Sequence, residues 1–118
     1  MCGFAGILNL GRHLSTAPST ALLREMGEKI VHRGPDEEGV YSSGAFGCVH
    51  RRLSIIDLSS HASQPMVDSE LGLTVAFNGC IYNFRDLRVQ LRALGYQFFS
   101  DGDTEVILKA YAAWGIDC

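Results

Sequence analysis

The thiol of Cys2, directly after Met1, is the side chain near the start of the chain with the most distinctive chemistry. If Met1 is removed, this residue carries both a thiol and a free α-amine, whose usual pKa of about 7.7–8.0 leaves a useful fraction unprotonated near neutral pH. Such an amine can act as the general base for its own nucleophile, as it does for N-terminal threonines. Cys2 is therefore a candidate nucleophile for acyl transfer. Its position alone, however, favours a residue without a catalytic role.

Asn78 and Gly79 could supply the second part of an acyl-transfer site. Such a reaction needs hydrogen-bond donors aimed at the oxyanion that develops in the transition state. A side-chain amide and a backbone N–H, adjacent at a sharp turn, can both point at one oxygen. The same dipeptide is also the strongest signal for a two-residue hairpin turn, and on the dipeptide alone the hairpin is favoured.

Two charged residues could hold the ends of a zwitterionic ligand. Arg52 lies among apolar residues, so the chain there is half buried, and its guanidinium fork suits a carboxylate. A pairing with Asp36 or Asp57 is equally compatible with the pattern. Asp103 could receive an ammonium group, or could only cap the last helix, which is the commoner use of such a residue.

The remaining histidines and cysteines match no metal motif. His32, His50 and His61 could each act as a general base, but their spacing favours structural roles. The cysteines lack C-x-x-C spacing, which predicts neither a zinc site nor a disulfide framework. They are Cys2, Cys48, Cys80 and Cys118.

Length and composition predict one globular domain. The chain has 118 residues, of which 47% are hydrophobic and 19% charged. A net charge of −3 indicates neither a nucleic-acid partner nor a membrane partner. No basic leader precedes the first apolar stretch, and no apolar run reaches the roughly 20 residues that span a bilayer. We therefore expect a cytoplasmic protein.

Apolar patterning in the first half of the chain predicts strands and one helix. Residues 3–9 are short and apolar, as in a buried strand. Residues 20–32 carry apolar side chains at helical spacing. Residues 40–41 and 46–56 predict two antiparallel strands joined by a turn. The polar residues 58–72 predict a loop.

The second half predicts further strands and two helices. Residues 73–77 form a strand that returns, after the Asn-Gly turn, over residues 80–82. A short strand is expected over 97–99. Helices are expected from Asn83 to Gly95 and from Asp103 to Gly115. The first of these has three arginines on one face, namely Arg85, Arg88 and Arg92. Such a face could be a docking patch but is far more often a solvated surface. Strands grouped together, with helices set apart, indicate the α+β class.

Seven short motifs, taken together and in order, resemble the class II glutamine amidotransferases. They are most similar to the glutaminase domain of glutamine-dependent asparagine synthetases, over nearly the whole chain. The motifs are Met1-Cys2-Gly3, His32-Arg33-Gly34-Pro35-Asp36, Arg52-Leu53-Ser54-Ile55-Ile56-Asp57, Gln64-Pro65-Met66, Phe77-Asn78-Gly79, Ile81-Tyr82-Asn83 and Asp103-Thr104-Glu105 with its preceding Gly102. The resemblance implies the N-terminal-nucleophile hydrolase fold, a four-layer αββα sandwich, with residues 1–118 forming the N-terminal portion of a domain truncated at its C-terminal end.

The resemblance also implies roles for the candidate residues. Cys2 would be nucleophile and base, and Asn78 and Gly79 would form the oxyanion hole. Arg52 would bind the α-carboxylate of glutamine, and Asp103 would hold its α-ammonium. The wall of the pocket beside the arginine would consist of Leu53, Ser54, Ile55 and Ile56. No metal ligand is implied.

Two positions depart from the pattern of this family. Cys80 stands where the family usually has a glutamate that contacts the substrate amine, and Gly102 replaces a serine. Cys80 could face the pocket as a weaker contact for the ammonium. It could instead face the core, because neighbouring strand residues alternate faces and free cysteine is commonly buried.

The activity implied is hydrolysis of L-glutamine to glutamate and ammonia, with no cofactor in this domain. The ammonia would serve asparagine synthesis in a C-terminal synthetase domain of the same parent chain, which would use ATP and Mg²⁺. Activity of residues 1–118 alone and a homo-oligomeric state are both left open. Two alternatives remain: the glutaminase domain of another class II amidotransferase, or a non-catalytic relic of the fold.

Overall fold

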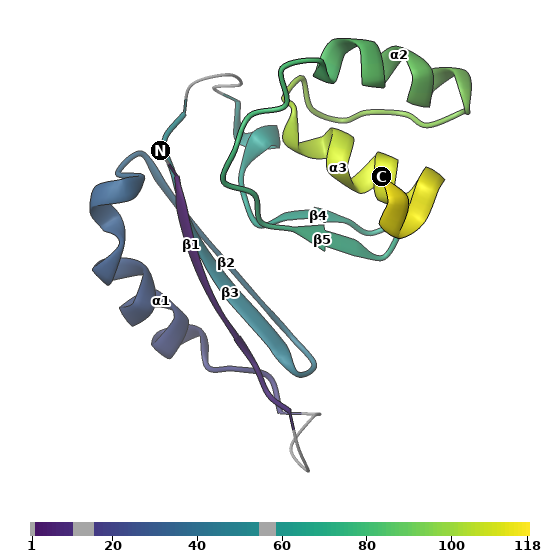
Figure 1. The fold of residues 1–118 in the computed structure, drawn as a ribbon. Coiled ribbons are helices and arrows are strands. Elements are labelled where there is room, and N and C mark those ends of the chain that lie inside the picture. Colours follow the sequence, from purple (N-terminus) through teal and green to yellow (C-terminus); the bar gives the residue numbers. More distant parts are fainter. Residues whose placement is uncertain (1, 11–15, 55–58) are drawn as a thin grey trace.

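A three-stranded antiparallel sheet and one helix form the first part of the molecule. The computed structural model describes residues 2–10, 16–54 and 59–118 (Figure 1). The strands β1 (Gly3–Leu8), β3 (Phe46–Arg52) and β2 (Glu37–Ser43) pair in the order β1-β3-β2. The central strand places Gly3 of β1 opposite Arg51 and Glu37 of β2 opposite Arg52, so the start of β1 lies beside the end of β3.

Helix α1 (Thr20–Lys29) covers one face of this sheet and continues into a short 3₁₀ helix, Val31–Arg33 (Figure 1). It buries Leu23 and Gly27. A methyl group on Gly27 would lie 2.8 Å from the side chain of Val49, so the absence of a side chain lets the helix approach the sheet closely. The predicted strand over 3–9, the helix over 20–32 and the two strands that follow are confirmed in outline.

The second part of the molecule packs two helices around a small apolar core (Figure 1). A 3₁₀ turn, Ser60–Ala62, leads to the antiparallel pair β4 (Met66–Asp68) and β5 (Leu73–Val75), and helices α2 (Phe84–Ala93) and α3 (Thr104–Trp114) follow. A last 3₁₀ turn spans Gly115–Asp117. The buried core residues are Leu91, Val106 and Ala110. The predicted helices are confirmed, and the α+β class with them.

Several predictions for this second part are wrong. The segment 58–72 contains β4, which pairs with β5. The Asn-Gly turn therefore does not join two paired strands, and residues 80–82 form no strand. Residues 97–99 form no strand either. Sequence-local patterns could not show that the partner of β5 precedes it in the chain rather than follows it.

The prediction that all three arginines of α2 are solvated is wrong for Arg88, which is 6% exposed. Its guanidinium donates hydrogen bonds to the carbonyl oxygens of Ser100 (2.7 Å) and Gly102 (3.1 Å), and it lies over the ring of Phe98. Glu105, which is fully buried, holds the same segment from the other side. Its carboxylate accepts hydrogen bonds from the backbone N–H groups of Phe99 and Ser100.

A buried ion pair joins α3 to β4. Lys109 contacts the carboxylate of Asp68, and both side chains are less than 8% exposed. Burial by itself would raise the pKa of Asp68, but the hydrogen bond and the positive charge of Lys109, together with backbone N–H donors, hold it below its usual value. This pair fixes the orientation of α3 and hence of the residues at its start.

Close backbone contact joins the two parts of the molecule. A methyl group on Gly39, in the edge strand β2, would come within 1.9 Å of the carbonyl oxygen of Gln64. Only glycine lets the chain at Gln64 cross the sheet at this distance. The crossing brings Gln64 into the space between the two parts.

Candidate functional site

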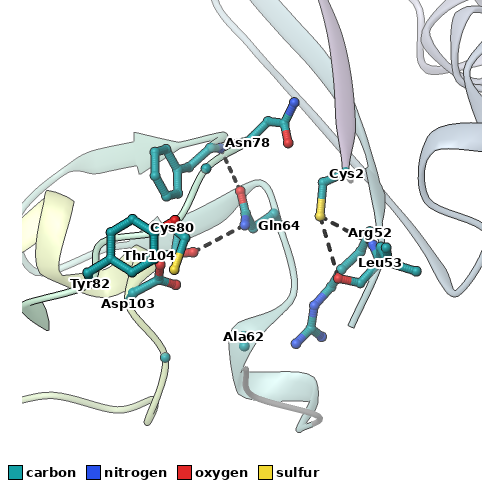
Figure 2. A pocket seen from close by; sticks show the side chains of 13 residues that line it. Cys2, Arg52, Leu53, Ala62, Gln64, Asn78, Cys80, Tyr82, Asp103 and Thr104 are labelled. Atoms are coloured by element: carbon teal, nitrogen blue, oxygen red, sulfur yellow. Dashed lines mark hydrogen bonds between the residues drawn. The ribbon is translucent and has the colours of Figure 1, made fainter. Parts of the chain in front are cut away.

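A cavity of about 370 Å³ lies between the two parts of the molecule (Figure 2). Its lining comes from the residue before β1, the end of β3, the segments on either side of the β4–β5 pair, and the start of α3. The candidate site residues that line it are Cys2, Arg52, Leu53, Asn78, Gly79, Cys80 and Asp103. The structure therefore brings together residues that are more than 100 positions apart in the sequence.

Cys2 lies at the sheet side of the cavity, with its sulfur half-buried (Figure 2). The sulfur accepts a hydrogen bond from the backbone N–H of Leu53 at 3.2 Å and lies 3.6 Å from the carbonyl oxygen of the same residue. The side chain of Arg33 donates a hydrogen bond to the carbonyl oxygen of Cys2 at 3.3 Å. These contacts fix the direction of the thiol relative to the cavity.

Asn78 lies across the cavity from Cys2, just beyond β5 (Figure 2). Gly79, which follows it, also lines the cavity. The ring of Phe77 lies against Gly79, where an added methyl group would be 2.5 Å from a ring carbon. A side chain at this position would therefore require the ring of Phe77 to move. The side chain of Asn78 is partly exposed, as a donor to a bound molecule must be.

The backbone N–H and carbonyl groups of Phe77, next to this turn, are each held by a buried side chain. Its N–H donates to Gln64 Oε1 at 2.6 Å, and its carbonyl oxygen lies 3.3 Å from His50 Nε2. A carbonyl oxygen can only accept, so Nε2 of His50 carries the proton. In the sequence, Gln64 stands out only as part of a motif, and the spacing of His50 favours a structural role, because no local pattern reveals a contact with Phe77.

Arg52 lines the cavity but also binds protein groups. Its Nη1 lies 3.0 Å from Glu37 Oε2 and donates to the carbonyl oxygen of Ser59 at 3.1 Å. Asp36, one of the two protein partners considered from the sequence, instead accepts a hydrogen bond from the backbone of Ser54. The other, Asp57, lies outside the described residues. A guanidinium has five N–H donors, so pairing with Glu37 is compatible with a second carboxylate partner.

Asp103 stands at the N-cap position of α3 but does not cap the helix with its side chain. Its Oδ2 accepts a hydrogen bond from the backbone N–H of Ile81 at 2.9 Å instead. The simple capping role that the sequence favoured is therefore wrong. The residue is 6% exposed and lines the cavity with Gly102 and Thr104.

Cys80 is exposed and lines the cavity, so the alternative that it faces the core is wrong (Figure 2). The physical reason is that residues 80–82 are not a strand, and the alternation of strand faces does not apply to them. Cys48 is the core cysteine of the chain. It is 1% exposed, and burial raises the pKa of its thiol.

The predicted pocket wall is reproduced only at its start. Leu53 lines the cavity, while Ser54 does not contribute to the lining. Ile55 and Ile56 lie outside the described residues. Among the described residues, no cluster of histidine, cysteine and acidic side chains is arranged to hold a metal ion. In the same part of the chain, no helix is both long and apolar enough to cross a bilayer.

Comparison with known proteins identifies relatives of the whole chain. Residues 1–118 match the family described as glutamine amidotransferase domain. The chain is 43% identical over 111 residues to asparagine synthetase [glutamine-hydrolyzing] 1 of Bacillus subtilis, covering 94% of this chain and 17% of the relative. It is 35% identical over 117 residues to asparagine synthetase [glutamine-hydrolyzing] 1 of Arabidopsis thaliana, covering 99% of this chain and 19% of the relative. The chain thus spans about a fifth of the length of these relatives.

The burial of His50 predicts a pH-dependent stability. Burial lowers the pKa of His50 below its usual value of about 6.5, and Arg52 acts in the same direction, while the hydrogen bond to Phe77 and the charge of Glu37 partly oppose it. As the pH is lowered, His50 therefore binds a proton at a higher pH in the unfolded chain than in the folded chain. The stability that neutral His50 contributes is fully present above a pH of about 6.5, and it is lost as the pH falls through the pKa of His50 in the folded protein.

We expect His50→Gln, which keeps a donor for Phe77 but does not titrate, to flatten this dependence. The measurement is the free energy of urea unfolding between pH 5 and pH 8, where one proton contributes at most about 1.4 kcal/mol per pH unit. The exposed His61 provides the matched control, His61→Gln. Equal slopes for wild type and His50→Gln would contradict the prediction.

Proposed function

Since this chain belongs to the glutamine amidotransferase domain family, we propose that it hydrolyses L-glutamine to glutamate and ammonia. The observation that carries the proposal is the meeting of Cys2, the Asn78-Gly79 turn and Asp103 around one cavity. A nucleophile, a pair of oxyanion donors and a carboxylate for the substrate amine are the groups that this reaction needs.

The reaction begins at the sulfur of Cys2, after removal of Met1 has freed the α-amine. The amine takes the thiol proton, and the sulfur attacks the side-chain amide carbon of glutamine. The tetrahedral intermediate collapses as the C–N bond breaks, and the protonated amine gives its proton to the leaving ammonia. Water then attacks the thioester carbon, which releases glutamate and regenerates the thiol.

Asn78 and Gly79 stabilise the negative charge that develops on the carbonyl oxygen in both steps. The side-chain amide of Asn78 and the backbone N–H of Gly79 are both donors. Their place across the cavity from Cys2 supports this role, because a substrate carbonyl between the two walls would present its carbon to the sulfur and its oxygen to the turn (Figure 2).

Charged side chains orient the α-carbon end of the substrate. The guanidinium of Arg52 binds the α-carboxylate, and the carboxylate of Asp103 receives the α-ammonium. Leu53 contributes the adjoining wall, and we assign Ser54, Ile55 and Ile56 to the same wall on the resemblance alone. Binding needs no cofactor in this part of the protein.

The ammonia is used by a synthetase domain of the same parent chain, which makes asparagine with ATP and Mg²⁺. The relatives of the chain support this acceptor, because their names describe glutamine-hydrolysing asparagine synthetases and they extend far beyond the matched segment. We place the protein in the cytoplasm.

We further propose that the chain is part of a four-layer αββα sandwich. The sheet face opposite α1 supports this fold, because Phe4, Leu8 and Phe46 on it are 40–58% exposed. In the αββα arrangement, a second sheet packs on such a face and removes these side chains from water.

The nucleophile is tested by Cys2→Ala in the parent protein. We expect complete loss of glutamine-dependent ammonia release, with ammonia-dependent asparagine synthesis retained, because only the first site loses its reacting atom. Cys118→Ala, at an exposed cysteine outside the cavity, is the control. Intact-mass measurement of wild type should show a chain without Met1. Glutamine hydrolysis by the Cys2→Ala variant would refute the mechanism.

Arg52→Ala should raise the KM for glutamine by roughly 30-fold or more, because truncating one partner of a buried charge pair costs about 2–5 kcal/mol. The matched control is Glu37→Gln, which removes the protein carboxylate paired with Arg52 but keeps the guanidinium. We expect this control to change KM far less. Equal rises in KM for the two variants would show that Arg52 serves only its pairing with Glu37.

Cys80→Glu should lower the KM for glutamine about threefold to tenfold with little change in kcat. The exposed position lets a carboxylate approach the substrate ammonium, but solvent screens part of a charge-assisted hydrogen bond. Cys118→Glu provides the same substitution away from the cavity. If the Cys80→Glu variant has the wild-type unfolding temperature and an unchanged KM, Cys80 does not contact the substrate.

A further inference from the structure

The Asn78-Gly79 turn lacks the support that a hairpin would give it. Strand β5 ends at Val75, and residues 76–83 form no strand. Among the described residues, no backbone–backbone hydrogen bond outside the regular elements involves residues 76–80. The position of the turn must therefore depend on contacts made by side chains.

Two of those contacts hold the ends of the turn. At its start, the N–H of Phe77 donates to Gln64 Oε1 at 2.6 Å, and at its end the N–H of Ile81 donates to Asp103 Oδ2 at 2.9 Å. Gln64 and Asp103 are 8% and 6% exposed, so water competes little for either hydrogen bond. The three residues between these ends include both proposed oxyanion donors.

A third hydrogen bond connects Gln64 to the residue that follows Asp103. Nε2 of Gln64 donates to Thr104 Oγ1 at 3.2 Å, and Thr104 directly follows Asp103 (Figure 2). Gln64, Phe77, Ile81 and the start of α3 thus form a closed frame around the turn. Gln64 is the member of this frame whose one side chain binds both the turn and α3.

The backbone of Gln64 is itself fixed against the sheet. Its carbonyl oxygen crosses Gly39 of β2 at a distance that excludes a methyl group there. The neighbouring strand contributes His50, whose Nε2 binds the carbonyl oxygen of Phe77 at 3.3 Å. The frame is therefore anchored on the same sheet whose strand β1 directly follows Cys2, which lets it set the distance between the turn and the sulfur.

We propose that Gln64 is a positioning residue for the oxyanion turn. It holds the backbone N–H of Phe77, and through Thr104 it couples the turn to Asp103, the residue proposed to bind the substrate ammonium. The inference rests on the proposed hydrolysis of glutamine. Gln64 acts through Asn78 and Gly79 and does not itself contact the reacting atoms. Oxyanion donors act only when they are held at the position that the charged oxygen will occupy, so loss of the frame affects kcat more than KM.

Gln64→Met in the parent protein tests this role, since methionine has a similar length and no hydrogen-bonding amide. We expect kcat for glutamine hydrolysis to fall on the order of 10- to 100-fold, with KM changed less than about threefold. Gln90→Met, at an exposed position of α2, is the matched control and should leave both constants unchanged.

Alkylation by iodoacetamide separates a displaced turn from a displaced nucleophile. This reaction forms an S–C bond as iodide leaves and the thiol proton passes to water, and it produces no oxyanion. In Gln64→Met we expect the rate at Cys2, followed by peptide mass spectrometry, to stay within about twofold of wild type. The rate at Cys80, which lies in the turn, should change more than the rate at Cys2.

Thr104→Val provides a second variant that leaves Gln64 in place. It removes only the acceptor for Gln64 Nε2, and we expect kcat to fall about threefold to tenfold, as for loss of one hydrogen bond. Thr104→Ser keeps the hydroxyl and should recover most of that loss. If Gln64→Met does not fold, the comparison of Thr104→Val with Thr104→Ser still tests the positioning role of Gln64.

Three results would overturn the role of Gln64. They are a wild-type kcat in Gln64→Met, a rise in KM with kcat unchanged, and a parallel fall in kcat and in the alkylation rate at Cys2. The second would mean that Gln64 contacts substrate directly, and the third that it acts on the nucleophile or on the whole fold. A wild-type parent that does not hydrolyse glutamine would overturn the proposed function itself, and this inference with it.

Discussion

The site depends on one constraint: a turn without a partner strand must have its peptide groups bound by side chains. Backbone N–H and C=O groups away from water are nearly always paired. In this molecule Gln64 and His50 bind the peptide of Phe77, and Asp103 binds the N–H of Ile81. These partners come from three separate segments, so the turn is positioned only when both parts of the molecule are folded and in contact.

The same constraint explains why charged residues are buried near the start of α3. The segment 96–103 has no regular structure, yet it must hold Asp103 against the cavity. Glu105 accepts hydrogen bonds from its N–H groups, while Arg88 donates to its carbonyl oxygens. Buried charges of this kind are costly unless each is fully paired, and here the backbone supplies most of the partners. The result is a rigid support for a carboxylate that would otherwise lie on a mobile loop.

Features that are encoded locally could be predicted from the sequence, whereas those that depend on contacts between distant segments could not. The helical spacing of apolar residues and the glycine at position 115 predicted α3 and its end, because both are local properties. Ordered motifs pointed to Cys2, Asn78 and Asp103, which do line one cavity. The pairing of β5 with β4 and the burial of Arg88 and Glu105 had no local signal. The partner of Arg52 was also missed, since Glu37 lies on a strand whose register only the fold defines.

The failure of the hairpin prediction follows from the chemistry that makes Asn-Gly useful at this site. An Asn-Gly pair favours tight turns in which the backbone reverses and its N–H groups are exposed. In a hairpin, the backbone N–H groups that follow the turn would donate hydrogen bonds to the paired strand. Here Asp103 takes the N–H of Ile81, and the ring of Phe77 packs on Gly79, so no second strand forms. Asn78 and Gly79 then line the cavity and are not paired with a second strand, which is compatible with the oxyanion role proposed for them. Neither residue of this pair has the positive φ angle that a type I′ hairpin turn requires, so the dipeptide lines the cavity without closing a hairpin.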